Sequence, residues 1–160
     1  MGFKSFKENY ANLQEKYSLP PLDDMNREFE LLDILKEKDV NPSFPLRFTR
    51  RMMISIFYSW INYLHNLIMP NPQSFIHVKE SEAFNDDEKT QVHNIIKEIM
   101  FINRLSAKLD LEHDQQKDAE FIKKYYKEWR KIKSLILELA EKNISCWKEE
   151  MPKDKEIYFG

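Results

Sequence analysis

Between Phe3 and Phe159 the chain contains no glycine, since Gly2 and Gly160 are the only two in 160 residues. Glycine supplies positive φ angles and close backbone approach, so phosphate-binding loops, dinucleotide-binding fingerprints, nucleophile elbows and EF-hand loops all depend on it. Tight two-residue hairpins of the Asn-Gly type depend on it as well. The sequence therefore excludes these sites and turns, and it predicts an all-α fold.

A second feature is the segment from Val40 to Lys79, which lacks any aspartate or glutamate although 27 of them occur along the chain. It contains the most apolar stretch of the protein, Met52 to Met69. A helix needs about 20 predominantly apolar residues to span a bilayer, and a polar stripe suits a globular helix instead. That stripe consists of Ser55, Ser59, Asn62 and Asn66. We expect one core helix with Trp60 buried and no membrane span; a partner-binding or interfacial helix is the alternative.

Length and composition indicate one soluble domain. A chain of 160 residues with 42% hydrophobic residues can bury a sizeable core. Its net charge of −2 gives no overall field that favours nucleic acid or an anionic membrane. The lone Cys146 excludes an internal disulfide, and the absence of an apolar leader predicts a cytoplasmic location. We assign residues 1–151 to a helical-bundle domain and residues 152–160 to a polar C-terminal tail.

The hydrophobic periodicity predicts a single-domain bundle of four to five helices with mostly antiparallel packing. Aromatic residues spaced by three and four indicate a first helix that ends at Pro20, and Asp23 or Asp24 is expected to cap a short second helix. A connector of about 15 residues follows Pro70, which is long for a compact bundle. The long helices are expected to begin near Pro45, Asn85 and Lys117.

The last helix carries a heptad seam of eight residues at alternating spacings of three and four. They are Ile122, Tyr125, Trp129, Ile132, Ile136, Leu139, Asn143 and Cys146. A second apolar stripe occurs in the distal half of this helix only, so that half needs two packing partners. We expect the aromatic face of the first helix to be the second partner. The second stripe consists of Leu137, Ala140, Ile144 and Trp147.

The sequence offers little catalytic chemistry. None of the four histidines lies in a HExxH motif or follows a glutamate by three positions, so zinc-protease and ferritin-like di-metal centres are unsupported. Asp110 and His113 share a helical face and form an alternative metal-binding pair. We otherwise predict no catalytic residue, no cofactor and no metal ligand, and we expect that the protein is not an enzyme.

A basic segment at the start of the last helix is the other candidate site. Aromatic residues interleaved with basic ones are typical of nucleic-acid binding, but the heptad phase turns Tyr125 and Trp129 toward the core. A positive surface then remains, which suits a solvated helix face, a polyanion or an acidic protein partner. We call this surface the basic face, and it consists of Lys123, Lys124, Lys127, Arg130 and Lys131.

Several short motifs resemble those of a family of small helical archaeal proteins of unknown function. The motifs are KYSLP at residues 16–20, Leu22 with Met25 and the Glu28-Phe-Glu30 triplet, FNDDEK at residues 84–89, and YFG at residues 158–160. The resemblance implies an archaeal, cytoplasmic origin and no particular activity or functional residue. The acid-free third helix departs from the family pattern, which leaves room for a partner surface specific to this chain.

The resulting functional hypothesis is a non-enzymatic interaction or adaptor module that binds an unknown protein partner or forms a homodimer. Two alternatives come from other classes. One is an RNA- or ribosome-associated protein that uses the basic face, and the other is a metal-binding helical protein that uses Asp110 and His113.

Overall fold

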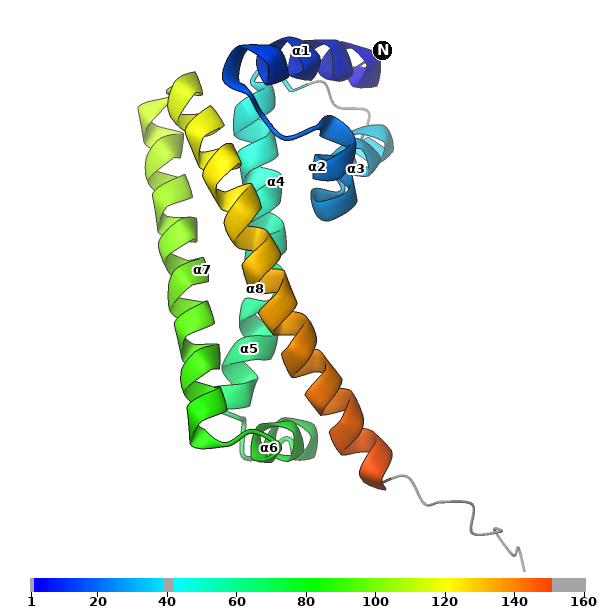
Figure 1. Cartoon of the computed structure of the whole chain (residues 1–160), viewed down its shortest axis with the longest axis vertical. Helices are drawn as coiled ribbons and strands as arrows, with labels where there is room; N and C mark the ends of the chain where they lie inside the picture. Colours follow the sequence, from blue (N-terminus) through cyan, green and yellow to red (C-terminus); the bar gives the residue numbers. More distant parts are fainter. Residues whose placement is uncertain (1, 39–41, 151–160) are drawn as a thin grey trace, which may run out of the picture.

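The computed structural model describes residues 2–38 and 42–150 of the chain, and within these ranges every regular element is a helix (Figure 1). The all-α prediction is therefore confirmed for the described part. Eight helical segments occur there instead of the four to five expected. They are α1 (Gly2–Tyr17), α2 (Leu22–Phe29), α3 (Leu31–Lys38), α4 (Pro45–Ser59), α5 (Ile61–Ile68), α6 (Phe75–Glu82), α7 (Asp86–Glu112) and α8 (Gln115–Glu150).

The centre of the molecule consists of α4 with α5, α7 and α8, which lie side by side (Figure 1). Helices α1, α2 and α3 cover one end of this group, and α6 lies across the other end. Helix α7 runs opposite to both α4 and α8, so α4 and α8 run in the same direction. The expected bundle with mostly antiparallel packing is not matched, because α4 and α8 pack in parallel and α1 and α6 lie across the two ends of the long helices. The tail predicted for residues 152–160 lies outside the described residues.

The N-terminal helices are separated by local backbone features rather than by loops. Tyr10 donates a hydrogen bond from its hydroxyl to the Pro20 carbonyl at 3.0 Å, which fixes the chain after α1. Helix α2 has Pro21 at its N-cap without a side-chain cap, so the expected capping by an aspartate is wrong. Glu30 adopts the left-handed conformation with φ 54° and divides α2 from α3. The single short helix expected here is therefore two.

The apolar segment is divided as well. Helix α4 ends at Ser59, Trp60 has a backbone hydrogen bond to the Phe57 carbonyl at 3.4 Å, and α5 begins at Ile61. Phe57 and Leu64 are completely buried on either side of this break, which confirms that the segment is a core element. Trp60 is 37% exposed, so the expectation of a buried tryptophan is wrong. Trp60 lies at the break itself, with φ −87° and ψ −12°, and its side chain stays partly in solvent.

The connector after Pro70 contains a helix that the periodicity did not indicate. Ser74 caps α6 by accepting a hydrogen bond from the backbone N–H of His77 at 3.3 Å. Ser81 is buried and donates to the Leu67 carbonyl at 2.8 Å, which ties α6 to the end of α5. A helix of eight residues with mixed polar and apolar positions gives a weak periodic signal, so tertiary contacts decide its formation.

Helices α7 and α8 agree most closely with the predictions made from the sequence. Helix α7 starts where the sequence predicted, and Asn85 and Glu88 form a capping box there, with both hydrogen bonds at 2.9 Å. The seam of α8 is buried from Ile122 to Asn143, while Cys146 is half-buried. Asn143 donates to the Tyr63 hydroxyl at 2.8 Å, but its buried side-chain oxygen has no partner among the described residues. The seam is thus confirmed, and one of the two polar atoms of the Asn143 amide has a partner.

Candidate functional site

The basic face lies on the outside of α8, as the heptad phase predicted. Four of its five side chains are exposed, and Lys123 is half-buried. Tyr125 and Trp129 are buried, so neither ring is available to stack on a nucleotide base. What α8 presents here is a row of cations without an aromatic platform.

Part of this charge is engaged within the protein. Lys131 pairs with Glu128 at 3.1 Å, and Arg130 donates to the Tyr126 hydroxyl at 2.7 Å. The Lys124 ammonium lies 5.3 Å from the centre of the Tyr125 ring. Exposed pairs of this kind contribute about 0–1 kcal/mol and leave the cations free to exchange partners. The role of the basic face stays a prediction.

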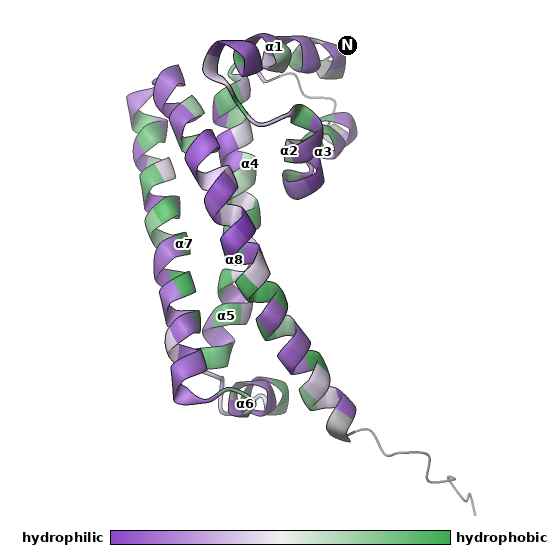
Figure 2. Cartoon of the chain, in the orientation of Figure 1, coloured by the Kyte–Doolittle hydropathy of each residue, from purple (hydrophilic) through white to green (hydrophobic). Residues whose placement is uncertain are grey.

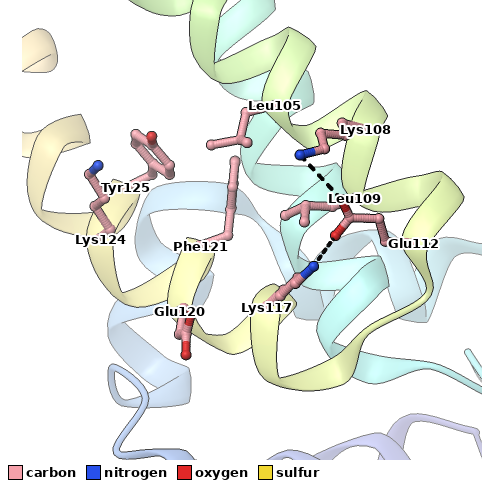
Figure 3. A pocket seen from close by; sticks show the side chains of 9 residues that line it. All are labelled: Leu105, Lys108, Leu109, Glu112, Lys117, Glu120, Phe121, Lys124 and Tyr125. Carbon is pink, nitrogen blue, oxygen red and sulfur yellow. Dashed lines mark hydrogen bonds and ion pairs between the residues drawn. The ribbon is translucent and has the colours of Figure 1, made fainter.

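A groove between the end of α7 and the start of α8 lies beside the basic face (Figure 3). It has a volume of about 320 Å³ and an apolar floor that includes Leu105 and Phe121. Its rim charges pair with one another, since Glu112 accepts from Lys117 at 2.5 Å and from Lys108 at 3.3 Å. The groove therefore has no unpaired charge at the Glu112 end with which to select an anionic or cationic ligand.

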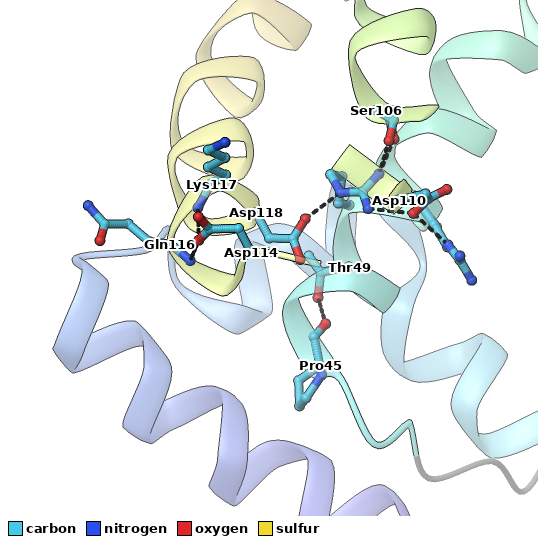
Figure 4. A network of polar contacts seen from close by, with 10 residues as sticks. Pro45, Thr49, Ser106, Asp110, Asp114, Gln116, Lys117 and Asp118 are labelled. Carbon is cyan, nitrogen blue, oxygen red and sulfur yellow. Dashed lines mark hydrogen bonds and ion pairs between the residues drawn. The ribbon is translucent and has the colours of Figure 1, made fainter. Parts of the chain in front are cut away.

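The most strongly connected polar group is Arg50 of α4, which is completely buried. Figure 4 labels three of its partners, Ser106, Asp110 and Asp118. Its guanidinium donates to Asp118 of α8 at 2.6 Å, to the Ser106 carbonyl of α7 at 2.6 Å and to Asp110 of α7 at 2.5 Å. It also hydrogen-bonds the Ser106 hydroxyl. Arg51 adds a further contact to Asp110 at 3.1 Å. This cluster joins α4, α7 and α8 at one level, so we interpret it as structural.

The same cluster bears on whether Asp110 and His113 can bind a metal ion. Asp110 uses one carboxylate oxygen to accept from both Arg50 and Arg51. His113 is exposed and forms the left-handed C-cap of α7 with φ 55°. Among the described residues no three His, Cys, Asp or Glu side chains gather in a way that could hold a metal ion. The geometry therefore places Asp110 in an ion pair, and in the described part of the chain no third side chain completes a metal site with Asp110 and His113.

Asp110 gives the protein a pH dependence of known sign. Burial acts to raise the pKa of its carboxyl group, but the hydrogen bonds and charges of Arg50 and Arg51 outweigh it and lower the pKa below the ordinary 3.8. A carboxyl whose pKa is lower in the folded state stabilises the protein above the unfolded-state pKa and loses that contribution as the pH falls through the folded-state pKa. We expect the destabilisation caused by Asp110→Asn, measured by urea denaturation, to be largest near pH 7 and to shrink below pH 3.8. A difference that stays constant down to pH 2, about two pH units below the ordinary value, would contradict this ion pair.

The second apolar stripe of α8 has a different environment from the one expected. Leu137 is 56% exposed and Ile144 is 46% exposed, whereas the seam beside them is buried. Helix α1 lies at the opposite end of the molecule, where Tyr17 donates to Gln115 at the start of α8 (Figure 1). The expectation that α1 covers this stripe is therefore wrong. Helix α1 contacts α2, α3 and α4 instead.

Two helices border the stripe without covering its middle. At one end Glu28 of α2 accepts from Lys133 at 2.8 Å, and at the other end Trp147 donates to Glu80 of α6 at 3.0 Å. Figure 2 shows hydrophobic residues along this lower half of α8. We define the distal apolar surface as Trp60, Leu137, Ala140 and Ile144. It is an apolar strip between two polar borders.

A small pocket opens in this surface where α8 crosses the α4–α5 break. It has a volume of about 110 Å³, and Trp60 forms one side of it while Leu137 and Ala140 form another. Sequence analysis identified the stripe but not the pocket, because a continuous helix places Trp60 in the core. The mixed neighbourhood of Trp60, between Ser59 and Asn62 of the polar stripe, is the sequence signal that could have indicated its exposure.

Comparison with protein-family models, curated proteins and solved structures gave no match. The resemblance to a family of small archaeal proteins therefore stays a prediction, as do the cytoplasmic location and the identity of any partner. Part of that resemblance, the YFG motif, lies outside the described residues. Of the helices that the structure describes, none combines the length and the hydropathy that crossing a bilayer requires.

Proposed function

We propose that the protein is a non-enzymatic interaction module that binds a helical segment of a protein partner on the distal apolar surface. The observation that carries this proposal is the stripe of α8 at heptad spacing, with Leu137 and Ile144 both exposed. Contiguous exposed apolar residues between polar borders are typical of protein interaction sites. A tryptophan beside a small pocket is also typical of the residues that dominate binding energy at interfaces.

The spacing of the stripe favours a helix as the bound element. Residues 137, 140, 144 and 147 follow intervals of three, four and three, which is the pattern that packs against another helix. The rise of about 1.5 Å per residue gives the stripe a length of roughly 15 Å, or nearly three helical turns. The pocket between Trp60 and Leu137 is placed to receive one apolar side chain of that helix.

Charge favours a different chain over a second copy of this one. An antiparallel pairing of two copies centred midway between the exposed Leu137 and Ile144 would place the two-fold axis between Ala140 and Glu141. The exposed Glu141 side chains would then approach each other, and like charges at such positions are destabilising. We therefore do not expect a homodimer. If one were found, the bound helix would belong to a second copy of this chain.

The proposal is tested by the double substitution Leu137→Glu with Ile144→Glu. Both side chains are exposed, so the free energy of unfolding should change by no more than about 0.5 kcal/mol. Losing two apolar anchors of about 1.5–3 kcal/mol each is expected to weaken partner binding by at least tenfold. The measurement is photo-cross-linking from position 144 in the native host, followed by titration of the captured partner's helix against both proteins.

Leu111→Glu is the matched control, because Leu111 is 83% exposed and lies at the far end of α7. It should leave binding unchanged. Equal binding of the partner helix by the wild type and the double variant would exclude the distal apolar surface. A wild-type dimer in solution that the double variant converts to a monomer would replace the partner helix by a second copy of this chain.

The RNA-associated alternative has weaker support. It depends on the basic face alone, and the burial of Tyr125 and Trp129 removes the stacking that sequence-tolerant binding to single strands uses. The metal-binding alternative depends on Asp110, whose carboxylate is engaged by two arginines. Neither therefore displaces the interaction module as the favoured function.

A further inference from the structure

Arg47, Arg50 and Arg51 lie in the acid-free segment just before its apolar stretch, and they differ in the partners that they contact. Arg50 and Arg51 reach carboxylates on α7 and α8, which compensate for the absence of acidic residues in their own segment. Arg47 forms no hydrogen bond or ion pair with the described residues, and its Nε atom is buried without a partner. A buried donor without an acceptor destabilises the folded state, and more so when it belongs to a charged group.

Arg47 is nevertheless held in a defined position. Its guanidinium carbon lies 4.7 Å from the centre of the Phe44 ring, a distance typical of a cation–π contact. Beside it is a pocket of about 160 Å³ between the start of α4 and the turn from α7 to α8. We call this the Arg47 pocket, and it is lined by Phe44, Leu46, Arg47, His113, Gln115 and Asp118.

The acidic side chains around the Arg47 pocket are already engaged elsewhere. Asp118 accepts from Arg50 at 2.6 Å. Asp114 accepts from the backbone N–H groups of Gln116 and Lys117 at 2.9 and 3.2 Å and so caps the start of α8. Asp110 accepts from Arg50 and Arg51. The positive charge of Arg47 is thus the one in this region that has no counter-charge among the described residues.

We propose that the Arg47 pocket binds a small oxyanion, a carboxylate or a phosphate, through the two terminal nitrogens of the Arg47 guanidinium, because its Nε atom is sealed from the pocket. The planar guanidinium presents these two donors in a fork that matches two oxygens of either group. The volume is below the range of about 300–1,000 Å³ typical of pockets for drug-sized ligands, so the bound group is small. Phe44 and Leu46 supply apolar contacts to any carbon atoms attached to it. This site is independent of the distal apolar surface.

The test is a titration of the wild type with sodium phosphate, sodium acetate and sodium succinate, each compared with sodium chloride at equal ionic strength. Binding is followed by the amide NMR signals of His113 and Gln115. A saturable shift with at least one of the three anions is expected, and which anions produce it distinguishes a phosphate from a carboxylate. The absence of a saturable shift with all three anions would overturn the proposal.

Arg47→Gln should weaken the response at least tenfold, and Arg47→Lys should weaken it while retaining the charge, because lysine lacks the fork. Arg27→Gln is the matched control: Arg27 is exposed on α2 and pairs with Asp24 at 3.5 Å, so it removes one positive charge away from the pocket. An unchanged response in Arg47→Gln would exclude Arg47 as the anion ligand. An equal loss in Arg27→Gln would mean that net charge and not the pocket is responsible. Far-UV circular dichroism verifies the fold, and if Arg47→Gln does not fold, an undiminished response in Arg47→Lys overturns the proposal.

Discussion

Replacing Arg50 by methionine should lower the free energy of unfolding by about 3–5 kcal/mol, because it leaves a buried charge uncompensated. The charge in question is Asp118, which is buried and loses its 2.6 Å contact with the Arg50 guanidinium. The Ser106 carbonyl loses its hydrogen bond as well. Urea denaturation followed by circular dichroism measures the change.

Two further variants separate the buried ion pair from charge in general. Arg51→Met removes the exposed neighbour that contacts the same Asp110, and an exposed pair of this kind is worth about 0–1 kcal/mol. The double variant Arg50→Met with Asp118→Leu should recover most of the lost stability, since replacing both buried partners by apolar side chains is often neutral. If Arg50→Met and Arg51→Met were equally mild, Arg50 would not be the buried centre of this cluster.

Phe57→Ala is expected to destabilise the protein by about 3–5 kcal/mol, the usual range for removing a buried phenylalanine from a core. The Phe57 ring is completely buried, with its centre 4.9 Å from that of Trp129 and 6.5 Å from that of Phe29. Its loss would open a cavity between α2, α4 and α8. The midpoint and slope of denaturant unfolding give the difference.

Trp60→Ala, three residues later, is the matched comparison. Trp60 is larger than Phe57, but it lies at the helix break and is partly exposed, so a loss of about 1–2 kcal/mol is expected. If Trp60→Ala were as destabilising as Phe57→Ala, Trp60 would be a core residue and not part of the distal apolar surface. Together the two variants test where the apolar segment changes from core to surface.

Sequence determined the helical character of the chain and the inner face of its longest helices. Without glycine between Phe3 and Phe159, tight turns and phosphate-binding loops were excluded by backbone sterics alone. The seam of α8 from Ile122 to Asn143 and the capping box at Asn85 follow from spacings within a few turns of one helix. Such features are local, so the order of residues is sufficient to predict them.

The number of helices depended on single residues whose backbone conformation is decided by their surroundings. Glu30 lies in the left-handed region, which an L-residue other than glycine occupies at an energetic cost. The nearby Asn26 side chain accepts from the Leu32 backbone N–H at 2.7 Å and stabilises this reversal. Trp60 divides α4 from α5 although its own φ of −87° lies in the right-handed region. No periodic pattern predicts these breaks, because each interrupts the periodicity itself.

Only the tertiary structure determined which apolar and charged residues stay exposed or unpaired and so form the candidate sites. The sequence showed that α8 has two apolar stripes and that three arginines precede the apolar segment, but not which surfaces would meet them. Asp110 and Asp118 lie 60 and 68 residues from Arg50 in the chain and still reach its guanidinium, while no described carboxylate reaches Arg47. The distal stripe stays exposed for the same kind of reason, because α1 packs at the other end. Periodicity fixes which side of a helix is apolar, whereas burial and charge pairing depend on distant residues that only the folded chain brings together.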